Sequence, residues 1–112
     1  MERTVKVGDS SSVIYKLNNH ESQTQFTLGL YLDIKSVSDP QLLLLLEMLP
    51  HKYPTLTIYY CTSSDSYLDG RGRHTLPYYE LYQWNKKIAG RIPTGPLFVN
   101  ELKTFIEIHL PH

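Results

Sequence analysis

The chain has 112 residues, 41% of them hydrophobic and 20% charged, and its 11 Lys or Arg are balanced by 11 Asp or Glu. This composition argues against disorder, and the zero net charge argues against bulk attraction to nucleic acid or an anionic membrane. The single cysteine, Cys61, excludes an internal disulfide and a cysteine-based zinc site. We expect one domain over residues 1–112 in the cytoplasm, because no signal peptide or membrane-spanning run is visible.

The first third of the chain predicts three strands. Residues 2–7 predict a short edge strand and residues 13–17 a second strand. Residues 26–34 give the cleanest alternation, because every second residue from Phe26 to Ile34 is apolar. We expect the second and third strands to form an antiparallel hairpin with one buried face.

A helix is predicted over residues 40–49. Ser38 can cap its start, and Pro40 is harmless in the first turn. Leucine occupies every position of residues 42–46, so we expect a helix buried on more than one side. The alternative is that one side packs on the core and the other meets a partner. Pro50 is expected to end the helix.

Residues 55–62 predict a central strand. Both of its faces carry strand-forming residues and neither carries a charge. We expect Cys61, near its end, to be a buried apolar residue, because no cation or helix start is close in sequence to activate a thiolate.

The last third of the chain predicts a loop and two helices. Residues 63–77 predict the longest loop. Residues 78–89 predict a helix that Pro77 opens and Gly90 closes. Its core stripe at helical spacing would be Leu81, Trp84 and Ile88. For residues 97–110 the pattern favours a helix over a strand.

These elements occur in the order β-β-β-α-β-loop-α-α. The order predicts an α+β fold, with a single mixed or antiparallel sheet of about four strands and two to three helices packed on it.

The basic residues are concentrated in residues 71–91, which hold five Lys or Arg and one Glu. Aromatic residues lie among these cations, and such a mixture suits an acidic protein surface or the phosphates and bases of a nucleic acid. The predicted binding residues are Tyr67, Arg71, Arg73, His74, Tyr78, Tyr79, Tyr82, Lys86, Lys87 and Arg91. The structural alternative is that the aromatic residues pack in the core and the cations are simply solvated.

From this pattern we expect a non-enzymatic protein-binding domain of accessory, inhibitor or immunity type. It would use the surface around residues 63–91 and bind a protein partner with an acidic surface. A homo-oligomer is a further option, and no membrane partner is expected.

Two alternative functions remain at this stage. One is nucleic-acid binding by residues 71–91, and the other is hydrolysis in the loop of residues 63–77 by Asp65, Asp69 and His74. No catalytic, metal or cofactor motif supports an enzyme, because the histidines lack metal-ligand spacing and the Gly-Arg-Gly-Arg run lacks the lysine of a phosphate-binding loop.

Overall fold

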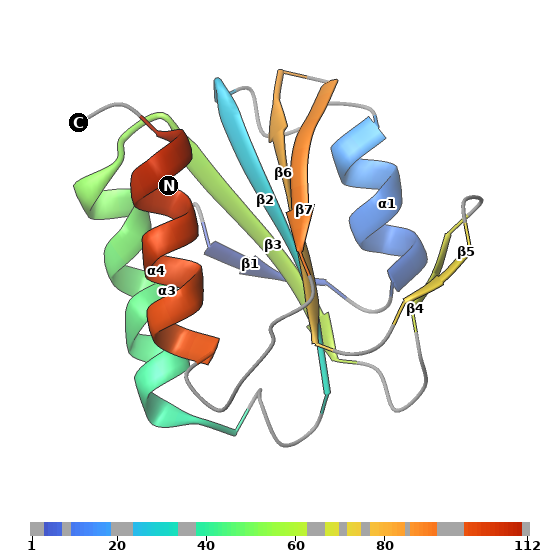
Figure 1. The fold of residues 1–112 in the computed structure, drawn as a ribbon, viewed down its shortest axis with the longest axis horizontal. Helices are drawn as coiled ribbons and strands as arrows, with labels where there is room; N and C mark the ends of the chain where they lie inside the picture. Colours follow the sequence, from blue (N-terminus) through green and yellow to red (C-terminus); the bar gives the residue numbers. More distant parts are fainter. Residues whose placement is uncertain are drawn as a thin grey trace.

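The computed structural model describes residues 4–7, 10–18, 24–33, 38–62, 67–69, 72–74, 77–84, 86–91 and 98–110. Its elements are β1 (Thr4–Lys6), α1 (Ser10–Asn18), β2 (Phe26–Leu32), α3 (Pro40–Lys52), β3 (Leu56–Thr62), β4 (Tyr67–Asp69), β5 (Gly72–His74), β6 (Tyr78–Gln83), β7 (Lys86–Arg91) and α4 (Phe98–His109). Helices α3 and α4 cover one face of a sheet and α1 covers the other (Figure 1). The predicted α+β class is confirmed.

The main sheet has five strands in the order β1-β3-β2-β6-β7, and β4 and β5 form a separate two-stranded sheet. Strands β1 and β2 run parallel to β3, whereas β6 is antiparallel to both β2 and β7. Parallel neighbours need a crossover connection, and α3 supplies it between β2 and β3. The mixed sheet is therefore confirmed, with β3 inside it and β1 at its edge as expected.

The strand predicted over residues 13–17 is wrong, because these residues belong to α1. Val13 and Leu17 are buried against the sheet, while Tyr15 between them is 60% exposed. A spacing of four residues brings two side chains to one face of a helix as well as of a strand. The five-residue pattern is too short to distinguish the helical period from the strand period. The hairpin that was predicted from this strand is therefore wrong as well.

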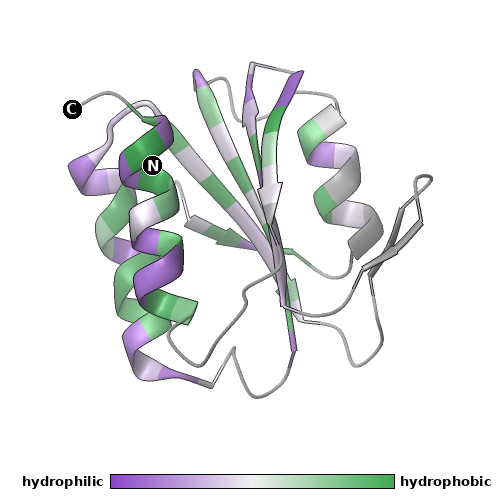
Figure 2. Ribbon diagram, in the orientation of Figure 1, coloured by the Kyte–Doolittle hydropathy of each residue, from purple (hydrophilic) through white to green (hydrophobic). Residues whose placement is uncertain are grey.

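Strand β2 is confirmed in position but not in its pairing. All seven of its residues are buried, where one solvent-facing side was expected. One face, with Leu28 and Leu30, joins the core beneath α3 and α4, and the other, with Tyr31, joins the core beneath α1. Figure 2 shows hydrophobic residues along β2 and β3 and on both α3 and α4.

Helix α3 begins as predicted but passes through Pro50 and ends at Lys52. Its cap is Asp39, not Ser38, and the Asp39 carboxylate accepts a hydrogen bond from the Gln41 N–H at 2.9 Å. Pro50 has no N–H to offer the carbonyl of Leu46 one turn earlier. The Thr4 hydroxyl of β1 donates to that carbonyl at 2.5 Å instead, so the proline is tolerated inside the helix.

The expectation that α3 is buried on more than one side is also wrong. Its buried residues are Leu42, Leu46, Leu49 and Pro50. On the opposite side Leu44 is 57% exposed and Met48 is 56% exposed. The helix therefore packs one face on the core and presents a second apolar face to solvent.

The helix predicted over residues 78–89 is replaced by the antiparallel strands β6 and β7. Trp84, with a φ of 56°, lies in the turn between them, and Gly90 lies within β7 instead of closing a helix. In the predicted stripe only Leu81 is buried, while Trp84 and Ile88 are exposed. The predicted long loop likewise contains β4 and β5, whose register pairs Tyr67 with His74.

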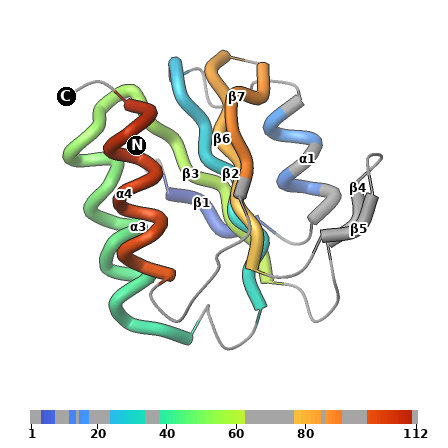
Figure 3. Tube along the Cα trace, viewed as in Figure 1, coloured from blue at the N-terminus to red at the C-terminus, as the bar shows by residue number. Residues whose placement is uncertain are grey.

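Helix α4 confirms the helix expected over residues 97–110. Leu102, Phe105 and Ile106 are its buried residues. Figure 3 shows this C-terminal helix running alongside α3. Of the helices that the structure describes, none combines the length and the apolar character that a membrane span needs.

Candidate ligand-binding groove

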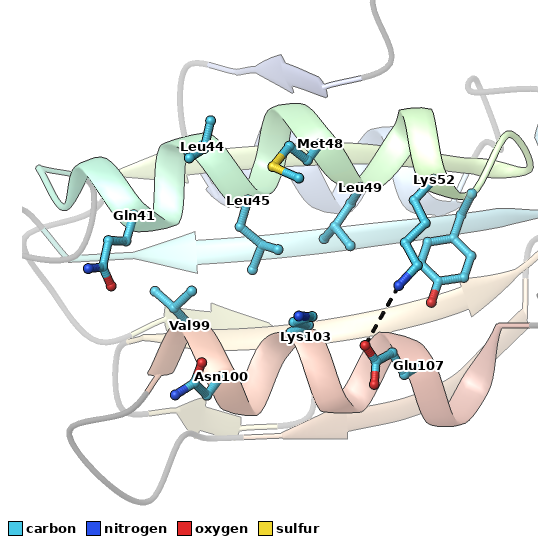
Figure 4. Close-up of a pocket in the computed structure, with 11 residues that line it drawn as sticks. Gln41, Leu44, Leu45, Met48, Leu49, Lys52, Val99, Asn100, Lys103 and Glu107 are labelled. Atoms are coloured by element: carbon cyan, nitrogen blue, oxygen red, sulfur yellow. Dashed lines mark ion pairs between the residues drawn. The ribbon is translucent and has the colours of Figure 1, made fainter.

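A groove of about 350 Å³ lies between α3 and α4 (Figure 4). On the α3 side it is lined by Gln41, Leu44, Leu45, Met48, Leu49 and Lys52, and by Tyr53, which directly follows the helix. On the α4 side it is lined by Val99, Asn100, Lys103 and Glu107. The α3 wall is mainly apolar and the α4 wall mainly polar. The groove is therefore amphipathic across its width.

Helical spacing explains both walls. Leu45 and Leu49 are one turn apart on α3 and point toward α4, and Val99 points back toward them (Figure 4). Because leucine fills every position of residues 42–46, the helix has apolar side chains left over after its core face is complete. Leu44 and Leu45 belong to this surplus and, with Met48 and the core residue Leu49 one turn later, form the apolar wall.

The charged side chains of the groove carry one more positive than negative charge. Lys52 Nζ and Glu107 Oε1 form an ion pair across one end at 3.8 Å, and Lys52 also lies over the Tyr53 ring, 5.6 Å from its centroid. Both partners of the pair are substantially exposed, so it contributes little to stability, about 0.5 kcal/mol or less. Lys103 forms no ion pair with any residue in the described part of the chain. It leaves the groove with one uncompensated positive charge.

A second polar cluster lies on the opposite face of the sheet, around Glu80 of β6. This carboxylate is 1% exposed, accepts a hydrogen bond from the Tyr31 hydroxyl at 2.9 Å, and lies 3.2 Å from Lys87 Nζ. The Tyr78 hydroxyl lies 3.4 Å from Glu80 and accepts a bond from Lys87 at 3.0 Å. The cluster ties β7 to the interior of the sheet.

The same contacts set the charge state of Lys87. Partial burial works to lower the pKa of its ammonium group, but the hydrogen bond to Tyr78 and the charge of Glu80 outweigh that effect. The pKa therefore lies above its ordinary value of 10.5. Lys87 is held as a cation and serves as a structural partner of a buried carboxylate.

In the structure, the residues predicted to form a binding surface differ in burial. Tyr78, Tyr79 and Tyr82 are buried in the core, so they are not the exposed aromatic residues that the predicted surface required. Lys86 is exposed and Lys87 is partly buried against Glu80.

The remaining predicted residues lie near β4, β5 and the end of β7. Tyr67 belongs to β4, Arg73 and His74 belong to β5, and Arg91 ends β7. Arg71 lies outside the described residues, as does Asp65 of the hydrolase alternative. Asp69, also part of that alternative, ends β4.

Sequence reasoning missed the groove as a site. The run of five leucines is its one signal in the sequence, and such a run mainly indicates a buried core helix. Asn100, Lys103 and Glu107 carried no signal, because polar residues at this spacing are typical of any solvent-facing helix side.

Cys61 is fully buried in β3, as expected, in the cluster beneath α1. A helix N-terminus can stabilise a thiolate, but at α3 that place belongs to the carboxylate of Asp39. Within the described ranges no group of three or more His, Cys, Asp or Glu side chains could hold a metal ion.

No protein-family model matches this chain, and no curated protein matches its sequence. Solved structures do match. Oxidised thioredoxin O2 from Arabidopsis thaliana is 16% identical with a TM-score of 0.62, over 96% of this chain and 95% of that one. Thioredoxin f2 from Chlamydomonas reinhardtii is 14% identical with a TM-score of 0.59, over 97% and 98%. Thioredoxin from Trypanosoma brucei brucei is 13% identical with a TM-score of 0.52, over 93% and 91%.

These neighbours overturn the function expected from the sequence. A non-enzymatic protein-binding domain acting through residues 63–91 is wrong, since the similar structures are thioredoxins and three tyrosines of that surface, Tyr78, Tyr79 and Tyr82, are buried. The neighbours support neither the nucleic-acid nor the hydrolase alternative. A thioredoxin-like redox motif is a Cys-x-x-Cys pair, and this sequence holds one cysteine. The chain therefore has a thioredoxin-like α+β fold without that pair.

Proposed function

We propose that this chain is a thioredoxin-fold protein that binds an apolar small molecule in the groove between α3 and α4. The exposed apolar wall carries the proposal, because Leu44 and Met48 line the groove and are more than half exposed. The groove volume of about 350 Å³ falls in the usual range for small-molecule sites, roughly 300–1,000 Å³. A ligand that covers this wall would gain about 25 cal/mol per Å² of apolar surface removed from water.

The two walls indicate the chemistry of the ligand. An apolar body would lie along the leucines of α3, and a polar group would turn toward Asn100 and Lys103 of α4. An anionic group is favoured because Lys103 has no carboxylate partner among the described residues. The α3 side of the groove extends roughly 16 Å from Gln41 to Lys52, at about 1.5 Å per residue, with its apolar residues between these polar ends, and this length suits an elongated ligand.

Fluorescence titration with anilinonaphthalene sulfonate, an apolar aromatic sulfonate, tests this site. We expect Met48→Lys to weaken binding by about tenfold, which corresponds to about 1.4 kcal/mol, and Lys103→Glu to weaken it as well. The matched control is Ile108→Lys, because Ile108 is 70% exposed on α4 but does not line the groove. Near-ultraviolet circular dichroism of each variant excludes binding to a loosened core. Equal binding by wild type and Met48→Lys would overturn the proposal.

The neighbours supply a second candidate, a single-thiol redox function at Cys61. The thioredoxin fold favours it, and the full burial of Cys61 opposes it. The measurement is the rate of thiol labelling in the native chain relative to the chain in denaturant. Labelling at a similar rate in both states would favour this candidate, and strong native protection would dismiss it. The absence of catalytic activity and a cytoplasmic location stay predictions.

A further inference from the structure

The outward face of α3 carries a ridge of three exposed residues, Leu44, Glu47 and Met48. Glu47 and Met48 lie three and four positions after Leu44, so both flank it on one face of the helix. Leu44 and Met48 leave apolar surface in water, and Leu44 points away from α4 (Figure 4). Nothing in the described part of the chain covers this ridge.

The ridge and the groove lie next to each other. Leu44 and Met48 belong to both, since they also line the groove. A surface that carries a projection beside a hollow can be self-complementary, because a two-fold rotation places each projection in the hollow of the other copy. We propose that two copies of this chain associate in this way, with the Leu44–Met48 ridge of each copy seated in the α3–α4 groove of the other.

Helix geometry fixes which residues would meet. Successive residues on a helix are about 100° apart, at 3.6 residues per turn. Moving around α3 away from α4, the groove-facing Leu45 is followed by Met48, then Leu44, then Glu47. In the two-fold arrangement Leu44 and Met48 would face α3 of the second copy, and Glu47 would face α4 of the second copy.

Charge complementarity supports this arrangement. Glu47 is exposed and has no ion-pair partner among the described residues, and the same holds for Lys103 in the groove. The two-fold rotation would bring Glu47 of each copy to Lys103 of the other, forming two equivalent ion pairs. The zero net charge of the chain also removes overall repulsion between copies.

The inference goes beyond the proposed function, although it uses the same groove. A second copy and a small apolar ligand would compete for that groove, so ligand binding would shift the chain toward the monomer. Self-association would then regulate access to the ligand site.

Sedimentation velocity over a range of protein concentrations tests the inference. We expect a reversible dimer in the wild type, and we expect Glu47→Lys and Lys103→Glu each to weaken it by about tenfold. The double variant Glu47→Lys/Lys103→Glu should restore dimerisation to within about threefold, because the ion pairs are re-formed with exchanged signs. Lys86→Glu is the control, since it changes the net charge on exposed β7 at a distance from α3.

Several outcomes would overturn the dimer. These are a wild type that stays monomeric at every concentration, a dimer that both single reversals leave unchanged, or a double variant as weak as the single ones. The ligand site can be tested independently of the dimer, because Glu47 does not line the groove. Glu47→Lys should therefore bind anilinonaphthalene sulfonate at least as tightly as the wild type. Loss of dye binding in Glu47→Lys with its fold intact would count against the ligand site alone.

Discussion

The carboxylate of Glu80 is nearly fully buried, and Lys87 is the cation that balances it. Removing one member of a buried pair is strongly destabilising, although Lys87 is 28% exposed and the Tyr31 hydrogen bond remains. We expect Lys87→Met to lower the free energy of unfolding by about 2 kcal/mol in urea denaturation. The control Lys86→Met should stay within about 0.5 kcal/mol, because Lys86 is exposed. Equal effects of the two variants would show that the pair contributes nothing.

The raised pKa of Lys87 predicts how this contribution depends on pH. In the unfolded chain the ammonium group loses its proton near the ordinary pKa of 10.5, whereas in the folded chain it keeps the proton to higher pH. The stabilisation is therefore complete well below pH 10.5 and is lost as pH rises through the folded-state pKa. We expect the stability difference between wild type and Lys87→Met to be constant up to about pH 9.5 and to shrink above it. A difference that grows with pH would contradict this account.

At the scale of the elements, α1 approaches the sheet closely at Gly29 of β2. A Cβ atom at this position would lie 2.7 Å from Leu17 Cδ1 and 3.2 Å from Val13 Cγ1. We expect Gly29→Ala to destabilise the fold by roughly 1–2 kcal/mol through overpacking, measured by thermal or urea unfolding. In a Leu17→Val background, which removes the nearest atom, the same change should be distinctly less costly. Equal costs in both backgrounds would mean that Leu17 does not set the contact.

A second contact between elements joins β1 to α3 through the Thr4 hydroxyl and the Leu46 carbonyl. We expect Thr4→Val to cost about 1 kcal/mol, because the carbonyl then loses its donor. In a Pro50→Ala background the cost should fall, because the restored N–H can donate to the same carbonyl. A double-mutant cycle of unfolding free energies measures this coupling. Strictly additive effects would show that the hydroxyl does not replace the missing N–H.

The sequence predicted some elements and missed others for physical reasons. The long apolar pattern of β2, the uncharged β3 and the three-turn stripe of α4 each fit one period over enough residues. Residues 13–17 were too few to separate a helix from a strand. For β6, the helical spacing of Leu81 and Trp84 favoured a helix. The strand alternation was hard to recognise because one of the inward-facing residues is the charged Glu80. Tyr31, which makes that charge tolerable in the core, lies 49 residues away.

Only the α3 half of the candidate groove could be predicted from the sequence. The leucine run of residues 42–46 indicates an apolar surplus, and exposure of one side of the helix is one of the two arrangements that such a surplus allows. The α4 half of the groove depends on where the fold sets that helix beside α3, which no local pattern encodes (Figure 3). The buried tyrosines are the opposite case, since they were predicted as site residues and are not exposed. Aromatic residues among cations indicated an exposed surface, but tertiary packing places these tyrosines in the core.

At the scale of the whole molecule, the thioredoxin-like scaffold carries an apolar groove between α3 and α4 and one buried cysteine. Two-dimensional ¹H–¹⁵N NMR spectra during titration with anilinonaphthalene sulfonate test whether this groove is the binding site. We predict that shift changes cluster on the groove residues of α3 and α4, from Leu44 to Lys52 and from Val99 to Glu107, while β6 and β7 stay unchanged. Shift changes confined to β6, β7 or the surroundings of Cys61, with α3 and α4 unaffected, would contradict the account.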